Sequence, residues 1–292
     1  MDYYSKYLKY KNKYTTLKSY ILKGGNDVSF SDNVILCGTH NNRLECFFRS
    51  IEKDYPNKAF NNCVVIKCYN ENDKLKFKMI YEGESYNLKH YKKSAWTIDS
   101  FNNFFNNKNY NIILPPNTDI LLIRHALGVH NKRSLLRTIF NFEKDSQLDV
   151  IGIEQSERAG IFLKSLRLKN IYFMASHLVR TQQTIAIIMK MINLIKPIYI
   201  VPCAHELNLV NNCYNSSCDN SILQKFPILS NMPKCRYNSN SCDKLTNFSG
   251  VDIYANYKVD INWDYYINYY NNNNKCENTN ILEQIIKLNE SL

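Results

Sequence analysis

The chain has 292 residues, of which 45% are hydrophobic and 22% are charged, as in ordinary folded proteins. Its formal net charge of +11 favours anionic partners such as phosphorylated metabolites, nucleic acid or acidic surfaces. No apolar run reaches the roughly 18 residues that span a bilayer, and the first residues are too polar for a secretory signal. These features argue against a membrane-spanning protein, and we expect a cytoplasmic one.

Residues 1–25 form a basic segment that differs from the rest of the chain. It contains six lysines and one aspartate, and its apolar side chains recur at alternating steps of four and three. This spacing predicts an amphipathic helix over residues 3–22, ended by Gly24 and Gly25. We favour a helix packed on its own domain or left as a basic arm, with a short dimerising coiled coil as the alternative. Binding of nucleic acid or an acidic surface stays open as an added property, and the oligomeric state is not indicated.

Short apolar runs alternate with helical patterns through residues 26–292, which we interpret as one domain. This alternation predicts an α/β fold with a mostly parallel sheet. We expect strands at residues 34–37, 64–67, 77–81, 120–123, 171–175 and 197–201, with a turn at 70–73. We expect helices at residues 41–51, 154–166, 181–195 and 281–288.

Two long stretches carry little pattern and are interpreted as additions to this core. Residues 82–117 form a connection, and their part from 98 to 112 is rich in Asn and Phe with little periodic signal. Residues 209–279 are interpreted as an insertion rich in Asn, Ser, Cys and Tyr. Their cysteines lack the tight Cys-x-x-Cys pairs of most structural zinc sites, which disfavours a metal and leaves disulfide pairing open. These cysteines are Cys213, Cys218, Cys235 and Cys242.

Reactive side chains follow four of the predicted strands. In an open α/β sheet the carboxyl ends of parallel strands share one edge, where ligands bind. Arginines match phosphate oxygens, a histidine can attack phosphorus, and a carboxylic acid can protonate the leaving oxygen. The sequence therefore predicts a phosphate site at this edge. Its candidate residues are His40 after 34–37, Arg124, His125 and Asn131 after 120–123, Ser176 and Arg180 after 171–175, and His205 and Glu206 after 197–201.

Three of these segments resemble the histidine phosphatase superfamily, which includes the cofactor-dependent phosphoglycerate mutases. ILLIRHALGVHN (120–131) resembles the family's strand followed by Arg-His-Gly and a later Asn. MASHLVRTQQTIAII (174–188) resembles its Ser-Pro-Leu-x-Arg-Thr element, and IVPCAHELN (200–208) the strand that presents its acid/base glutamate. The sequence departs from the family at Ala126 and Asn41, where glycines are usual, and at His177, where proline is usual.

The family's second histidine has no counterpart after Glu206. However, NVILCGTHNNRLECFF (33–48) resembles the strand, Ser-His-Gly and helix that carry it, and NCVVIKC (62–68) resembles the family's terminal strand. Residues 281–288 resemble the helix that precedes the second-histidine strand. The resemblance, which covers about residues 33–81, 118–208 and this last helix, therefore implies a circularly permuted, phosphoglycerate mutase-like three-layer sandwich.

The resemblance also implies roles. His125 would form a phosphohistidine, Arg124, Arg180 and His40 would clamp the phosphoryl oxygens, and Glu206 would be the general acid and base. Asn131, Ser176, Asn41 and His177 would contact the substrate, and no metal or cofactor is implied. We expect a phosphatase acting on a small phosphorylated molecule or phosphoprotein, with a mutase or a degenerate phosphate-binding module as alternatives.

The N-terminal segment has a resemblance of its own. Lysine- and tyrosine-rich extensions that end in Gly-Gly are found on many proteins of giant DNA viruses, and residues 1–25 are similar to them. This resemblance implies a viral origin, with host cytoplasm or virion as the location, and no chemistry.

Overall fold

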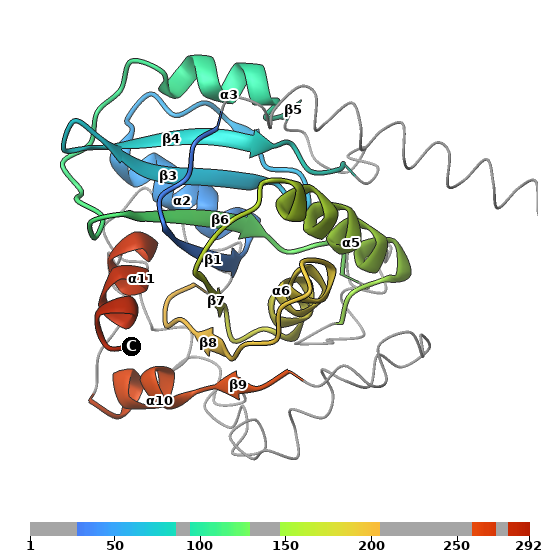
Figure 1. The fold of residues 1–292 in the computed structure, drawn as a ribbon. Helices are drawn as coiled ribbons and strands as arrows, with labels where there is room; N and C mark the ends of the chain where they lie inside the picture. The colour runs from blue at the N-terminus through green and yellow to red at the C-terminus, as the bar shows by residue number, and fades with distance from the viewer. Residues whose placement is uncertain (1–27, 86–93, 129–146, 205–258, 273–279) are drawn as a thin grey trace, which may run out of the picture.

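The computed structural model describes residues 28–85, 94–128, 147–204, 259–272 and 280–292 (Figure 1). Its centre is a seven-stranded sheet in the order β4-β3-β6-β1-β7-β8-β9. The strands are β1 (Asn33–Thr39), β3 (Val65–Glu71), β4 (Lys74–Tyr81), β6 (Thr118–Arg124), β7 (Ile171–Ala175), β8 (Ile198–Ile200) and β9 (Ile261–Asn262). A second, two-stranded sheet joins β2 (Lys58–Ala59) to β5 (Ser94–Ala95).

The α/β prediction with a mostly parallel sheet is confirmed. Strand β1 lies between β6 and β7 and runs parallel to both, and β8 and β9 continue the parallel arrangement. Only β3 and β4 are antiparallel, β3 to β6 and β4 to β3. All seven residues of β6 are buried, as are six of the seven in β1, which fits strands covered on both faces.

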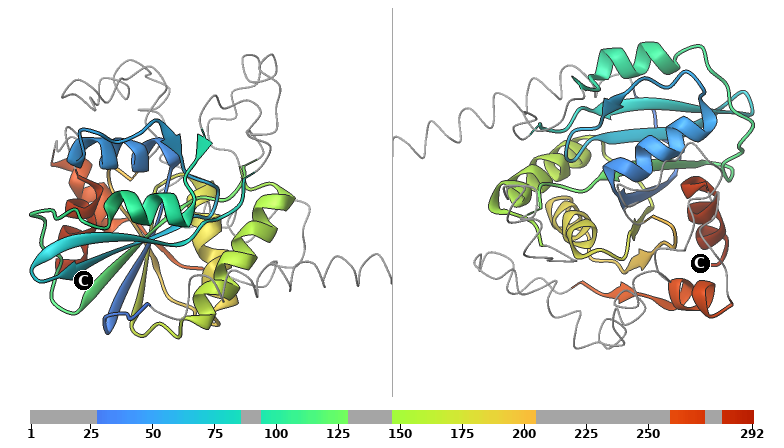
Figure 2. Two further views of the ribbon diagram at one scale, coloured as in Figure 1. Left: turned by 90° about the horizontal axis from the view of Figure 1, so that it is seen from above. Right: turned by 180° about the vertical axis from the view of Figure 1, so that it is seen from behind.

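Helices cover both faces of the sheet, so the protein has three layers (Figure 2). Helices α5 (Val150–Ser165) and α6 (Val179–Met191) pack on one face, in one hydrophobic cluster. Helices α2 (Asn41–Ile51), α3 (Ile98–Phe105) and α11 (Ile281–Glu290) pack on the other face, in a second cluster. Alternate side chains of β1 supply the two clusters, Val34 and Leu36 to the first and Ile35 and Cys37 to the second.

Several element boundaries differ from expectation for local reasons. Helix α6 ends at Met191 and not at 195, because Asn193 adopts a positive φ of 61° that a helix cannot continue through. The β3–β4 turn is tighter than residues 70–73, because Asn72 and Asp73 alone carry the positive φ values of 51° and 58°. Two such residues match the twist of a β-hairpin.

Two stretches interpreted as additions contain regular structure. Residues 82–117 include α3, whose Thr97 and Ser100 form a reciprocal capping box and whose Phe101 and Phe105 are buried. The range 209–279 includes β9, the edge strand paired with β8, and helix α10 (Asp264–Asn271). These elements were missed because a short helix and a two-residue strand give almost no periodic signal.

A buried ion pair fixes the segment before β1 to the sheet, at the end of the sheet far from His40 and His125. Lys67 Nζ lies 3.1 Å from Asp119 Oδ2, and both side chains are buried. The same carboxylate oxygen accepts a hydrogen bond from the backbone N of Ser31 (2.8 Å), and Lys67 Nζ donates to the carbonyl of Ser29 (2.5 Å). The segment before β1 is therefore fixed to β3 and β6 by one buried pair.

Several predictions lie outside the described residues. They are the helix at residues 3–22, Asn131, His205, Glu206 and the cysteines Cys213, Cys218, Cys235 and Cys242. Within the residues that are described, no helix is both long and apolar enough to cross a membrane.

Candidate active site

Three parallel strands bring reactive residues to one edge of the sheet. The register pairs Thr39 with Arg124 and Gly38 with Ala175. The residues that follow continue this pairing, because His125 N donates to the Thr39 carbonyl (2.9 Å) and Ser176 N to the Gly38 carbonyl (2.9 Å). His40, His125 and Ser176 therefore leave β1, β6 and β7 side by side, as expected for the carboxyl ends of parallel strands.

Arg180 of α6 joins the two histidines. Its Nε lies 3.3 Å from Nε2 of His125, and its Nη2 lies 3.3 Å from Nδ1 of His40. The histidine rings are 4.9 Å apart between centroids, inclined at 59°. All three side chains are buried. Four residues expected at the site from sequence, with Ser176 as the fourth, are thus brought together.

The hydrogen-bond partners select one tautomer for each histidine. A guanidinium can only donate, so the ring nitrogens that face Arg180 accept through their lone pairs. His125 then carries its proton on Nδ1, which lies 2.6 Å from the Ala126 carbonyl. His40 carries its proton on Nε2, which lies 3.1 Å from Oγ of Ser176. This arrangement leaves Nε2 of His125 as an unprotonated nitrogen beside a cation.

Arg124 is held by a turn between β2 and β3. Its Nη1 donates to the carbonyl of Phe60, and its backbone N and O bond to Val64 O (3.3 Å) and Cys63 N (3.0 Å). Asn62 in the same turn donates from Nδ2 to the carbonyl of His125 (3.0 Å). Neither Phe60 nor Asn62 was expected at the site, because their roles depend on a turn in which Cys63 has a φ of 58°.

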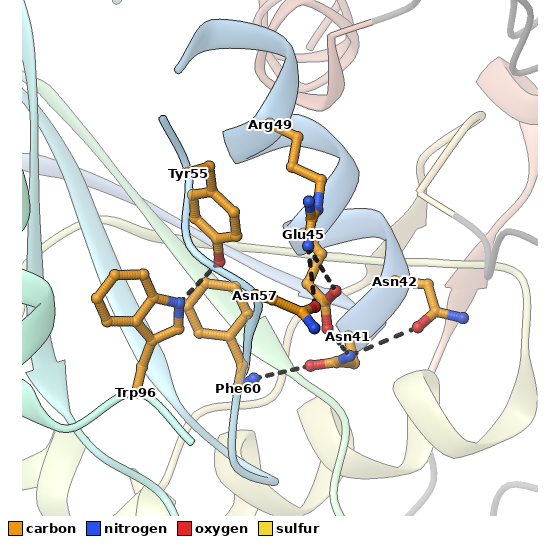
Figure 3. Close-up of polar contacts among 8 residues, drawn as sticks. All are labelled: Asn41, Asn42, Glu45, Arg49, Tyr55, Asn57, Phe60 and Trp96. Carbon is orange, nitrogen blue, oxygen red and sulfur yellow. Dashed lines mark hydrogen bonds and ion pairs between the residues drawn. The ribbon is translucent and has the colours of Figure 1, made fainter. Parts of the chain in front are cut away.

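Asn41 serves this turn through its side chain. Its Oδ1 accepts from the backbone N of Phe60 (2.8 Å), and its Nδ2 donates to Oε1 of Glu45 (2.5 Å), as Figure 3 shows. The Phe60 residue in turn binds the Arg124 guanidinium through its carbonyl. Asn41, expected from sequence to contact substrate, therefore has both amide atoms engaged with the protein.

His177 lies beside the cluster in a different environment. Burial, together with the nearby Arg180 charge, lowers the pKa of His177 to about 4. Its ring centroid is 5.6 Å from that of Tyr266 on α10. Near neutral pH His177 is uncharged, so it adds no positive charge to the site.

Two helices begin at this edge and add to its positive potential. Helix α2 starts immediately after His40, and α6 starts at Val179, three residues after Ser176. Their N-cap residues, His40 and Leu178, make no side-chain capping bond. Helix N-termini carry partial positive charge, which together with Arg124 and Arg180 suits an anion with several oxygens.

The residues that the structure describes contain no group of three or more His, Cys, Asp or Glu side chains placed to hold a metal ion. The described part of the site is instead built from nitrogen donors and imidazoles. Such a set matches phosphate in charge and geometry.

Comparison with known proteins agrees with this chemistry. A family model described as the histidine phosphatase superfamily (branch 1) matches residues 120–212. The matched range, about a third of the chain, holds Arg124, His125, Ser176 and Arg180, and is similar to a superfamily that includes phosphatases and mutases. His40 lies outside the match. No curated protein and no solved structure matches the chain.

Proposed function

We propose that the protein is a metal-independent phosphatase that works through a phosphohistidine on Nε2 of His125. The observation that carries this proposal is the buried His125–Arg180–His40 cluster, in which the guanidinium lies 3.3 Å from a nitrogen of each ring. Phosphatase chemistry needs an unprotonated nucleophile next to fixed positive charge, and the partners of His125 favour that state.

In the first step, Nε2 of His125 attacks phosphorus while the bond from phosphorus to the ester oxygen breaks. Arg124, Arg180 and His40 stabilise the charge on the three equatorial oxygens. Glu206 gives its proton to the leaving oxygen. In the second step, the Glu206 carboxylate takes a proton from water, the water oxygen attacks phosphorus, and the phosphorus–nitrogen bond breaks.

The proposed role of Glu206 has support from its position in the chain. Ala204, two residues before it, accepts a hydrogen bond from Oγ1 of Thr39 (3.1 Å). Thr39 directly precedes His40, so the chain after β8 passes the same edge of the sheet. Ala204 therefore lies at this edge, which supports Glu206, two residues further along the chain, as the proposed acid and base. Asn131, six residues after His125, is proposed as a further phosphate contact.

We also propose that the chain is circularly permuted relative to the superfamily. Its support is that β1 and His40 come first in the chain but lie between β6 and β7, outside the range of the family match. The proposed mechanism needs His40 to bind the phosphoryl oxygens as well as His125 to attack phosphorus. A test of His40 therefore tests the permutation as well.

The test is hydrolysis of p-nitrophenyl phosphate by the purified protein in the presence of a chelator. We expect turnover in the wild type, its abolition in His125→Ala, and a loss of at least about 100-fold in His40→Ala. His90→Ala, a histidine that belongs to none of the motifs, is the matched control and should keep full activity. Alkaline quenching and mass spectrometry should find phosphate on His125.

The outcomes separate the alternatives. Full activity in His125→Ala would refute the proposed phosphohistidine mechanism. Full activity in His40→Ala would refute the proposed circular permutation. Stoichiometric transfer of the phosphoryl group to a substrate hydroxyl, in place of release as inorganic phosphate, would identify a mutase. Phosphate binding without any turnover or phosphohistidine would identify a binding module.

A further inference from the structure

The two peptide groups that follow His125 are held by hydrogen bonds to side chains from other elements. The peptide group between His125 and Ala126 accepts at its oxygen from Asn62 Nδ2 (3.0 Å) and donates from its nitrogen to Thr184 Oγ1 (3.0 Å). The next peptide donates from Leu127 N to Gln155 Oε1 (3.0 Å). Its oxygen, the Ala126 carbonyl, is the atom that faces Nδ1 of His125 at 2.6 Å.

These hydrogen bonds to the backbone determine the tautomer and the orientation of the His125 imidazole. The direction of the Ala126 carbonyl follows from the orientation of the two peptide planes, because consecutive planes are rigid units joined at Ala126. That carbonyl fixes the proton on Nδ1 and so leaves Nε2 facing Arg180. Rotation of the first peptide plane would move the carbonyl and would loosen both the tautomer and the direction of Nε2.

Asn62 is itself held in a fixed position by burial and by backbone contacts. Its side chain belongs to a residue that is 5% exposed, and its carbonyl accepts from Glu84 N (2.9 Å). The carboxylate of Glu84 binds the guanidinium of Arg158 on α5 through two hydrogen bonds. A Cβ at Gly83 would lie 2.2 Å from the Asn62 carbonyl oxygen, so only glycine permits this approach. The Asn62 amide is therefore a fixed donor aimed at one backbone oxygen.

We infer that Asn62 is a positioning residue for the phosphorylated histidine, holding the His125 peptide so that Nε2 points at the phosphoryl group. The inference rests on the proposed function and adds to it a residue outside the family match. Asn62 does not reach the reacting atoms. Its contribution is to the rate of phosphoryl transfer and not to the affinity for substrate.

Asn62→Asp separates this role from a structural one. The variant keeps the shape of the side chain, but an ionised carboxylate only accepts, so it opposes the His125 carbonyl; a protonated carboxyl can donate again. We expect kcat at pH 8 to fall about tenfold or more with KM within about twofold. The ratio of variant to wild-type kcat should rise as pH is lowered, whereas Asn62→Ala should show a low, pH-independent ratio.

The pH readout is a ratio because other ionisable groups lie nearby. Five ionisable residues surround residue 62 and are present in the wild type and in the variants. They are His125, Cys63, Glu84, Arg124 and Arg158. The same groups are also present in Asn62→Ala, so a pH dependence of the ratio that appears in Asn62→Asp and not in Asn62→Ala comes from the new carboxyl group. Nitrogen NMR of the His125 ring provides a second readout that does not require turnover, since Asn62→Asp should raise the Nε2-protonated fraction at high pH.

The matched control is Asn102→Asp on α3. Asn102 also donates from Nδ2 to a backbone carbonyl, that of Met79 (3.1 Å), far from the site. It should lose stability but keep kcat and its pH profile. A flat Asn62→Asp ratio, an effect on KM alone, or kinetics equal to those of Asn102→Asp would overturn the inference. Retained activity in His125→Ala would instead overturn the proposed function itself.

Discussion

Nε of Arg180 lies 3.3 Å from Nε2 of His125, and the same guanidinium lies 3.3 Å from Nδ1 of His40. One planar cation therefore spans two imidazoles that come from strands 85 residues apart in the chain. A phosphoryl group that enters between the rings would meet the guanidinium, which can bind two oxygens at once. This relationship makes Arg180 the first residue to test after the histidines.

Arg180→Lys keeps the positive charge but replaces the planar fork with a single ammonium group. Because lysine cannot make the bidentate contact, we expect kcat on p-nitrophenyl phosphate to fall by about 100-fold. The control is Arg49→Lys on α2, a partly exposed residue that packs over Tyr55 away from the site. Equal activity in both variants would show that Arg180 acts only through its charge or not at all.

Gly152 on α5 supports the segment that follows His125. A Cβ at this position would lie 2.1 Å from the carbonyl oxygen of Leu127, whose backbone N is bound by Gln155. Gly152→Ala should therefore displace residues 125–127, lower the free energy of unfolding by about 1–3 kcal/mol and reduce kcat of the folded protein. Urea denaturation and steady-state kinetics measure the two effects.

Gly160→Ala on the same helix is the comparison. Its Cβ would meet Met191 at 2.6 Å, in the contact between α5 and α6 and away from His125. We expect a similar loss of stability with kcat unchanged. If Gly160→Ala lowers kcat as much as Gly152→Ala, the effect on catalysis comes from general loosening of the two helices.

The sequence predicts much of the sheet and part of the site. Continuous apolar runs identify β1, β6 and β7, and because their carboxyl ends share an edge, the proximity of His40, His125 and Ser176 follows from topology alone. The turn that carries Phe60 and Asn62 does not follow, because it depends on tertiary hydrogen bonds to Arg124 and His125. The role of Asn41 is likewise set by a partner 19 residues away and not by its place in a motif.

The pair formed by Lys67 and Asp119 should behave as a coupled unit. Burial lowers the pKa of Lys67, and the carboxylate of Asp119, 3.1 Å away, opposes this shift. Lys67→Met and Asp119→Asn should each lower the free energy of unfolding by about 3–5 kcal/mol, since each leaves a buried partner uncompensated. Urea denaturation measures these values.

The double variant tests the coupling. With both charges removed, no buried ion is left, so the combined loss should be well below the sum of the two single losses. Strict additivity would mean that the two residues stabilise the protein independently. Activity of the folded variants should be unchanged, because the pair lies at the opposite end of the sheet from His125.

His177 gives the protein a pH-dependent term in its stability. Its pKa of about 4 in the folded state lies below the value of about 6.5 expected in the unfolded chain. As pH falls from 6.5 towards 4, the unfolded chain binds a proton at this residue and the folded protein does not. Stability is therefore lost on acidification through this window, and is retained above it.

His177→Gln should remove this term. We expect the stability advantage of the wild type over the variant to shrink by about 1–3 kcal/mol between pH 7 and pH 4, measured by urea denaturation at each pH. Comparing the two proteins at the same pH cancels the titration of the carboxylates that they share. An advantage that stays constant across this range would show that His177 is protonated equally in the folded and unfolded states, and hence that neither burial nor Arg180 keeps it neutral.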